Sequence, residues 1–270
     1  PTPIQRSTIN SLCHTQPIFG LELHGSTQLD QIITMSTDGR ICIWNPKNLS
    51  KPFETVELYS PVENNTEKSI MTYAMAFQPG ESNKCFIGGE NGKLYSTHLL
   101  GSNSGIEHTY RGHHAPVTAI HAHPMPEFGD LILTSSMDWS CKLWSHKYRR
   151  PLLSIDEFKD YVYDIKWSPT HPAMFASVDG SGCLSIWNMN KDLDLPMLSE
   201  QVCDNPLNKL QWMPDGRSIL TGSATGHVHM YKLDEDVAVP KQVYDEAQML
   251  KKVRQELIAS YMETYDGNVE

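Results

Sequence analysis

The sequence lacks the excess of basic residues that nucleic acids and anionic membranes attract. Its 270 residues carry 22 Lys and Arg against 32 Asp and Glu, a formal net charge of −10. Phosphate backbones and acidic lipid headgroups bind surfaces rich in Lys and Arg. We therefore expect no nucleic-acid partner. No apolar run approaches the roughly 20 residues of a membrane span, so we expect no membrane insertion either.

Closely spaced cysteine pairs are also missing. The chain has six cysteines, and none of them forms a Cys-x-x-Cys pair. Three of them, Cys42, Cys141 and Cys183, lie in the segment that we expect to be the final strand of a repeat. A disulfide or metal framework is indicated by characteristic spacings, which are absent. We interpret the cysteines as free thiols that pack as small apolar residues in a reducing compartment.

Motifs that carry catalysis or phosphate binding are absent as well. There is no Gly-x-Ser-x-Gly elbow and no His-Glu-x-x-His motif. The glycines of Ile87–Gly92 lie between two β-like runs and are typical of a hairpin turn. His121 with His123, and His227 with His229, have a spacing that faces one way on a strand, but no further zinc ligand follows at a recognisable distance. We therefore expect that the protein is not an enzyme and that it has no catalytic residues, no bound metal and no cofactor.

What the sequence does contain is one pattern repeated five times: a β-rich run, a polar tight turn, and a strand that ends in an aromatic residue or its substitute. The clearest copies are Ser36–Trp44 and Ser136–Trp144. The others end at Trp187, Tyr231 and, in a degenerate form, Thr97. The turn position recurs at intervals of about 43 to 53 residues, at Asp38, Asn91, Asp138, Ser181 and Thr225. Such a repeat, with four short strands in each copy, predicts an all-β fold, the WD-repeat β-propeller.

The His and Asp residues of two repeats predict a buried hydrogen-bond network. In a WD blade, a His donates to the turn Asp, and a hydroxyl and the Trp N–H extend the chain; Thr134 or Ser136 supplies the hydroxyl in the third repeat. The predicted members are His14, Asp38, Trp44, His113, Thr134, Ser136, Asp138 and Trp144. A His–Asp pair also resembles a catalytic acid and base. Its recurrence in register favours a structural role, because an active site does not normally recur in every blade.

After Pro240 the pattern changes to a helical period. Residues 244–263 contain no Gly or Pro, which predicts an amphipathic helix, and we assign residues 244–270 to this helix and a tail. A free helix of this length is marginal in water, so its apolar stripe should be buried, either on the propeller or on a partner. The candidate partner-binding residues are Leu250, Val253, Leu257 and Tyr261 of the stripe, together with Arg149 and Arg150 of the only notable basic cluster.

Several segments of the chain resemble the dynein intermediate chains. These segments are Ser135–Trp139 with Lys142–Trp144, Asp160–Ala173, Ser36–Gly39 with Ile41–Cys42, and Pro206–Asn208. The resemblance runs from about Gln5 to Pro240 and is stronger to the cytoplasmic than to the axonemal chains. It implies a non-catalytic scaffold that docks on the tail of the dynein heavy chain, contacts other dynein subunits, and resides in the cytoplasm on the microtubule cytoskeleton.

The resemblance also implies that this chain is one part of a longer protein. In the family, light chains and dynactin bind an N-terminal region that is not in this chain. Five repeats are visible where the family propeller has more, and the sequence starts at Pro1, so we expect upstream blades that complete a ring of seven. Residues 1–243 are then the visible part of the propeller. Two alternatives stay open: an axonemal intermediate chain in a cilium or flagellum, and a propeller with a metal-binding or enzymatic role.

Overall fold

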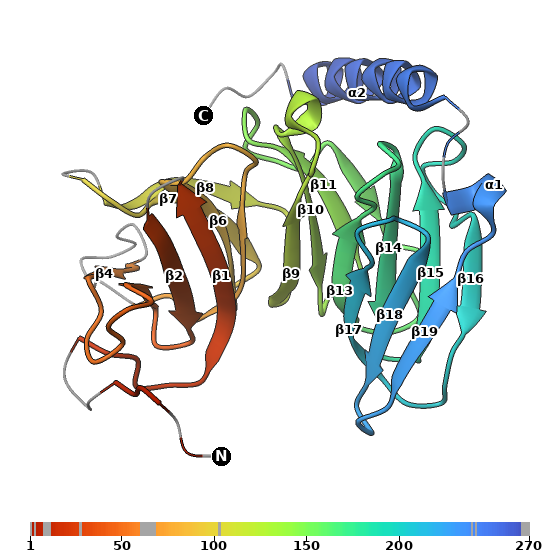
Figure 1. The fold of residues 1–270 in the computed structure, drawn as a ribbon. Coiled ribbons are helices and arrows are strands. Elements are labelled where there is room, and N and C mark those ends of the chain that lie inside the picture. The colour runs from red at the N-terminus through yellow and green to blue at the C-terminus, as the bar shows by residue number, and fades with distance from the viewer. Residues whose placement is uncertain are drawn as a thin grey trace.

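The computed structural model describes residues 2, 4–7, 12–26, 29–59, 69–101, 104–238, 240 and 242–265. Within these residues the chain forms five antiparallel sheets, which are followed by a C-terminal helix (Figure 1). In every sheet, consecutive strands are hydrogen-bonded neighbours. This arrangement is that of propeller blades, and it confirms the predicted all-β WD-repeat class with a C-terminal helix.

Four of the five blades have four described strands each. The first blade comprises β1 (Ile18–Ser26), β2 (Leu29–Ser36), β3 (Arg40–Trp44) and β4 (Glu54–Glu57). The second comprises β5 (Thr72–Phe77), β6 (Lys84–Gly89), β7 (Lys93–His98) and β8 (Gly105–Arg111). The third comprises β9 (Val117–Ala122), the short 3-10 helix η1 (Pro126–Phe128), β10 (Leu131–Ser136), β11 (Cys141–Ser145) and β12 (Leu153–Ile155). The fourth comprises β13 (Val162–Trp167), β14 (Met174–Asp179), β15 (Cys183–Asn188) and β16 (Leu198–Gln201).

The fifth blade has three described strands and leads into the helical end of the chain. Its strands are β17 (Leu207–Trp212), β18 (Ser218–Ser223) and β19 (Val228–Lys232). They are followed by the one-turn helix α1 (Glu235–Ala238) and by α2 (Val243–Tyr265), which extends slightly beyond the predicted range at both ends. Residues 266–270 of the predicted tail lie outside the described residues. No helix in the described part of the chain has the length and apolar character needed to span a membrane.

The turn between the second and third strands requires a backbone conformation that glycine adopts most easily. Four blades place a glycine there with φ between 73° and 86°, namely Gly39, Gly92, Gly182 and Gly226. The third blade places Trp139 at the same position, with φ 64°. A residue with a Cβ is strained in this region, so glycine is favoured at this position and Trp139 is an exception.

The blades follow one another in chain order and make an open arc, with the first and fifth blades at opposite ends (Figure 1). Neighbouring blades contact each other through their first strands, from β1 with β5 to β13 with β17. Apolar side chains are exposed at both ends of the arc. Leu21 and Leu23 of β1 are 63% and 69% exposed, and Val228 and Met230 of β19 are 72% and 64% exposed. Further blades that cover these surfaces remain a prediction.

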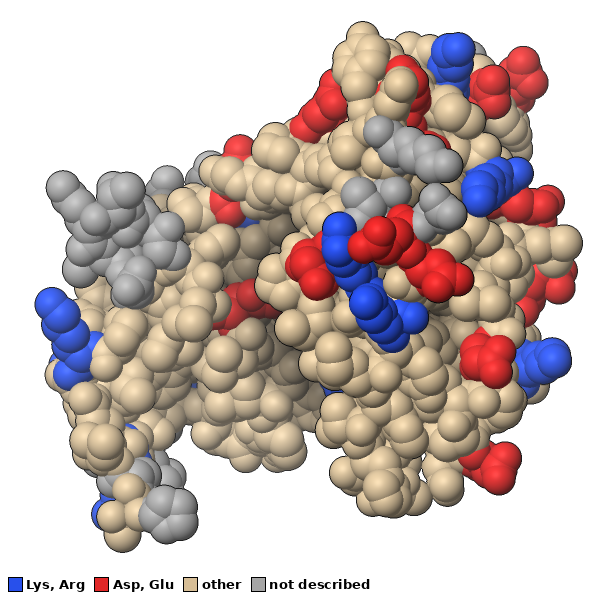
Figure 2. Space-filling view, turned by 45° about the vertical axis from the view of Figure 1, so that its right-hand side comes forward, with Lys and Arg blue, Asp and Glu red and all other residues tan. Residues whose placement is uncertain are grey.

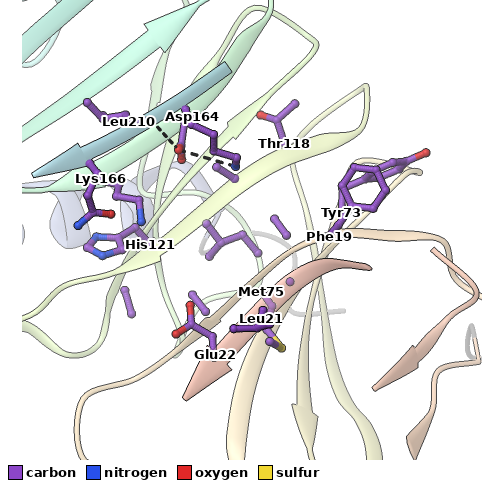
Figure 3. Close-up of a pocket in the computed structure, with 18 of the residues that line it drawn as sticks. Phe19, Leu21, Glu22, Tyr73, Met75, Thr118, His121, Asp164, Lys166 and Leu210 are labelled. Carbon is purple, nitrogen blue, oxygen red and sulfur yellow. Dashed lines mark hydrogen bonds and ion pairs between the residues drawn. The ribbon is translucent and has the colours of Figure 1, made fainter. Parts of the chain in front are cut away.

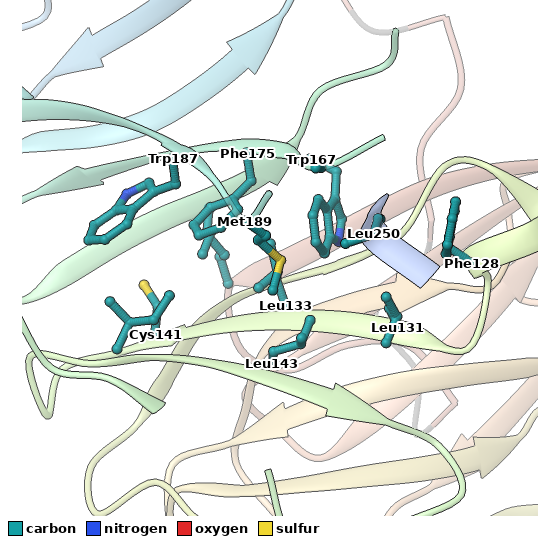
Figure 4. Close-up of a cluster of buried hydrophobic side chains, with 14 of the residues drawn as sticks. Phe128, Leu131, Leu133, Cys141, Leu143, Trp167, Phe175, Trp187, Met189 and Leu250 are labelled. Carbon is teal, nitrogen blue, oxygen red and sulfur yellow. The ribbon is translucent and has the colours of Figure 1, made fainter. Parts of the chain in front are cut away.

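The largest apolar cluster lies between the third and fourth blades and under helix α2 (Figure 4). Phe175 and Trp187 stack with ring centroids 5.7 Å apart and almost parallel planes. Leu250 of α2 is 1% exposed and belongs to this cluster, as does Ala247. The helix is therefore part of the hydrophobic core of these two blades.

Candidate functional site: blade networks, the helix-covered face and the central cavity

A continuous hydrogen-bond chain runs through the third blade. The indole Nε1–H of Trp144 donates to the hydroxyl of Thr134 at 2.8 Å. The same hydroxyl lies 2.7 Å from Nε2 of His113, whose Nδ1 lies 2.9 Å from the carboxylate of Asp138. An ionised carboxylate only accepts, so Nδ1 carries the imidazole proton and Nε2 accepts from Thr134. Of the two predicted hydroxyls, Thr134 is therefore the one that joins the chain.

Asp138 is also held by the turn in which it lies. Its carboxylate accepts hydrogen bonds from the backbone N–H of His114 at 2.9 Å and from the Ser140 hydroxyl at 2.6 Å. Ser136 stands beside this chain: its hydroxyl donates to Ala115 O at 3.0 Å and accepts from the Asp138 N–H at 3.1 Å. The turn is thus tied to the segment that enters the blade.

The pKa values of the pair follow from burial and mutual contact. Burial lowers the pKa of His113, although its hydrogen bond to Asp138 works in the other direction. Burial alone would raise the pKa of Asp138, but the hydrogen bonds from His113, Ser140 and the His114 N–H together hold it below its usual range. The pair is therefore a neutral imidazole beside a carboxylate, with every polar atom engaged within the fold.

The first blade repeats the chain with one looser contact. Trp44 Nε1–H donates to the Thr34 hydroxyl at 2.7 Å, and this hydroxyl lies 2.8 Å from His14 Nε2. The distance from His14 Nδ1 to Asp38 is 3.4 Å, and Asp38 accepts the backbone N–H of Thr15 at 2.8 Å. Because the same set occurs in two blades, we propose that it stabilises the blades and performs no chemistry.

Sequence reasoning missed two further hydroxyls that accept a Trp N–H, as Thr134 does. Thr34 precedes Trp44 by ten residues, and Ser177 precedes Trp187 by ten residues. In the fourth blade, the Trp187 N–H donates to the Ser177 hydroxyl at 2.9 Å. A search for Ser or Thr ten residues before each Trp would have found both.

The candidate partner-binding residues of the helix contact the chain itself. Leu250 is buried, and Leu257 packs against the same cluster of the third and fourth blades. The ring of Tyr261 lies 4.8 Å from that of Tyr148, and Val253 is half-buried. The apolar stripe is thus used on the propeller surface, the first of the two sites that the sequence left open, and Leu250 has no surface left for a partner.

The two candidate arginines are also engaged by aromatic rings of the chain. The guanidinium of Arg149 lies 5.2 Å from the centre of the Tyr110 ring. That of Arg150 lies 5.0 Å from the Tyr265 ring at the end of α2. Cation–π contacts of this kind fix arginines against a surface. The structure brings Arg150 and the helix stripe into one region and places Arg149 over the second blade.

Polar contacts that sequence reasoning did not foresee fasten α2 at both blades. Arg254 donates to Asp130 of the third blade at 2.8 Å. Asn190 of the fourth blade donates to the backbone carbonyl and the carboxylate of Glu246, at 2.9 Å and 2.5 Å. No sequence signal links residues so far apart along the chain.

A cavity of about 560 Å³ lies where the first strands of all five blades converge. Figure 2 shows it as a hollow between the two ends of the arc, and Figure 3 shows side chains from several blades directed toward it. Its most buried charged residue is Asp164, which accepts the backbone N–H groups of Ile165 and Leu210 at 3.0 Å each. Burial raises the pKa of Asp164, while Lys209 and Lys166 oppose this. The carboxylate thereby joins the fourth blade to the fifth.

The first of the two histidine pairs that suggested a metal site, His121 with His123, is engaged in protein contacts. His121 Nδ1 accepts the backbone N–H of Trp167 at 3.0 Å. His123 Nε2–H donates to Pro172 O at 2.8 Å, and its Nδ1 accepts the Met125 N–H at 3.2 Å. Within the described residues, no group of three or more potential ligands is placed to hold a metal ion.

The six cysteines are free, and Cys42, Cys85 and Cys141 are fully buried.

Two comparisons with known proteins bear on this geometry. The family model of the WD domain, G-beta repeat, matches residues 105–145, which run from β8 of the second blade through β11 of the third. The cytoplasmic dynein 1 intermediate chain of Drosophila melanogaster is 40% identical over 245 residues, which cover 89% of this chain. The resemblance to the cytoplasmic dynein intermediate chains is confirmed. The match spans 36% of that relative's length, so it concerns a part of the relative and not the whole.

Proposed function

We propose that this chain is a propeller segment of a cytoplasmic dynein intermediate chain, and that it serves as a non-catalytic scaffold docked on the tail of the dynein heavy chain. The observation that carries the proposal is the 40% identity over 89% of the chain. A match of this extent covers blades and connections alike.

The geometry supports a scaffold role. A docking platform must keep its loops in fixed positions, and the networks around Asp38 and Asp138 lock two of the five turns. Helix α2 adds a second constraint, because it packs on the third and fourth blades together. Rigid elements that position surface loops are what a binding platform requires.

The same relationship supports the proposed location and partners. The relative is a cytoplasmic chain, which favours the cytoplasm and the microtubule cytoskeleton over the ciliary axoneme. Other dynein subunits are proposed partners as well, with light chains and dynactin bound by a region outside this chain. Both rings of the pair His121 and His123 already serve the fold, so no observation favours the metal-binding or enzymatic alternative.

Purification of the tagged full-length protein from cells tests the proposal. We expect the dynein heavy chain to co-purify in a fixed stoichiometric ratio and to persist through a washing step in moderate salt. The third blade supplies a folding control, because Asp138→Ala should weaken recovery only as far as it lowers the folded fraction. Recovery of a stable, folded protein without heavy chain would refute the scaffold role.

A further inference from the structure

Four of the five equivalent turns have a glycine at the position with positive φ, and the third blade has Trp139 there. Its φ of 64° brings Cβ close to the following carbonyl oxygen, and a bulky side chain rarely accepts this. The indole is nevertheless 47% exposed. A strained backbone that holds a large aromatic residue in solvent indicates a function for that residue.

The equivalent turns differ in the space they leave for a side chain. At Gly92 and Gly182 an added Cβ would lie 2.5 Å and 2.0 Å from backbone oxygens of His113 and Cys203, at the entry to the following blade. At Gly226 nothing lies within 4 Å of an added Cβ. The large side chain of Trp139 therefore stands at a position where two of the equivalent turns have no room for any side chain.

The side chain of Tyr161 lies next to Trp139. Its ring meets the indole of Trp139 edge to face, with centroids 6.4 Å apart, and it is itself 44% exposed. Tyr163 continues the row at 6.4 Å from Tyr161. Two half-exposed aromatic rings that support each other resemble the anchors that dominate protein interfaces.

The surroundings of these rings are acidic. β11 pairs Cys141, two residues after Trp139, with Ile155, the last residue of β12. The exposed Asp156 and Glu157 follow Ile155 and so leave β12 at the end of the hairpin that carries the Trp139 turn. Asp160 precedes Tyr161 and accepts its backbone N–H at 2.7 Å, and the segment contains one cation, Lys159. The local charge is negative, as is the net charge of −10 for the chain.

The aromatic pair lies on the face opposite to helix α2. Arg254 of the helix contacts Asp130 at the start of β10, and β10 runs from there to the turn that holds Trp139. A partner on this turn would leave the helix contacts undisturbed.

We propose that Trp139 and Tyr161, with Asp156 and Glu157 beside them, form a docking site for a Lys- or Arg-bearing segment of a partner protein. Aromatic faces attract such cations, and the carboxylates add long-range attraction. The inference rests on the proposed function, since it assigns the segment to the heavy-chain tail.

The test uses the full-length protein with purified dynein heavy-chain tail as the probe. Trp139→Gly restores the residue of the other four turns, and Trp139→Asn supplies a second residue that tolerates this conformation. We expect both variants to keep or raise the melting temperature and to weaken binding at least tenfold. Phe53→Ser is the matched control, because Phe53 is a 72% exposed aromatic on the first blade; it should bind as the wild type does.

A separate double variant tests the role of the two carboxylates. Asp156→Asn with Glu157→Gln should weaken binding several-fold and reduce its dependence on salt. If this double variant binds as tightly as the wild type and with the same salt dependence, the proposal of a basic partner segment is wrong. Binding by Trp139→Gly equal to wild type, or a melting temperature lowered by several degrees in both Trp139 variants, would overturn the docking site and leave the proposed function standing. A wild-type protein that does not bind the tail would overturn both.

Discussion

Arg254 of helix α2 lies 2.8 Å from Asp130 of the third blade, 124 residues earlier in the chain. At the other end of the helix, Asn190 of the fourth blade bonds Glu246. The helix therefore spans two blades and is fixed to each, with Leu250 buried between these contacts. It acts as a strap that holds neighbouring blades together.

The strap predicts a graded response to charge placed along α2. Leu250→Asp puts a carboxylate into the apolar cluster and should lower the free energy of unfolding by about 3–5 kcal/mol. Leu257→Asp should cost less, because Leu257 is only partly buried. Lys252→Asp, on the exposed side of the same helix, should change little. Chemical denaturation measures all three, and equal midpoints for the Leu250 and Lys252 variants would show that the helix is not docked.

The two WD networks predict different costs for the same substitution. Asp138→Ala removes an acceptor 2.9 Å from His113 and should cost about 1–3 kcal/mol, because buried partners lose their hydrogen bonds. Asp38→Ala breaks a 3.4 Å contact to His14 and should cost less. Thermal melts of both variants test this. An unchanged melting temperature for Asp138→Ala would show that this network does not stabilise the third blade.

The networks could be predicted from the sequence because they repeat. His113, Asp138 and Trp144 stand at spacings that recur in the first blade, and this recurrence is the reason to interpret the His–Asp pair as structural and not as catalytic. Thr34 was missed, although its ten-residue spacing from Trp44 carries the same information.

Features that occur once could not be predicted in this way. The contact between Arg254 and Asp130 joins distant segments and has no local signal. Helical periodicity identified the stripe of α2 but not the surface that buries it, because period alone says nothing about the opposing partner. Trp139 follows the turn position Asp138, and the other four repeats have a glycine directly after this position, so the sequence shows the replacement, and its positive φ shows that the backbone keeps the glycine conformation.

Two histidines with lowered pKa values predict a loss of stability in acid. Burial lowers the pKa of His121 to about 3 and of His123 to about 4. In the unfolded chain both titrate near 6.5, so below that pH the unfolded state binds more protons, and each histidine costs about 1.4 kcal/mol per pH unit until its folded pKa is reached. Asp164, whose pKa is raised, acts in the opposite direction, since acid favours its neutral form.

We therefore expect the free energy of unfolding to fall as the pH is lowered from 7 to 5. His123→Gln keeps a donor for Pro172 O but cannot titrate, so it should flatten this fall while lowering stability at pH 7. Urea titrations at several pH values measure both effects. A flat profile for the wild type between pH 7 and 5 would contradict the assigned neutral histidines.

The exposed apolar side chains at the ends of the arc predict self-association of residues 1–270 produced alone. Leu21 and Leu23 on β1 and Val228 on β19 are exposed on strands, which are ready templates for pairing. We expect concentration-dependent association in size-exclusion chromatography with light scattering. The double variant Leu21→Thr and Leu23→Thr should reduce it, and Phe53→Ser should not. A monodisperse wild-type monomer at high concentration would show that the ends need no covering.

The most direct test of the scaffold assignment is sedimentation velocity of the purified full-length protein mixed with purified dynein heavy-chain tail. We expect one faster boundary that contains both proteins at a fixed ratio. Two separate boundaries at the positions of the free proteins, with the full-length protein folded, would contradict it.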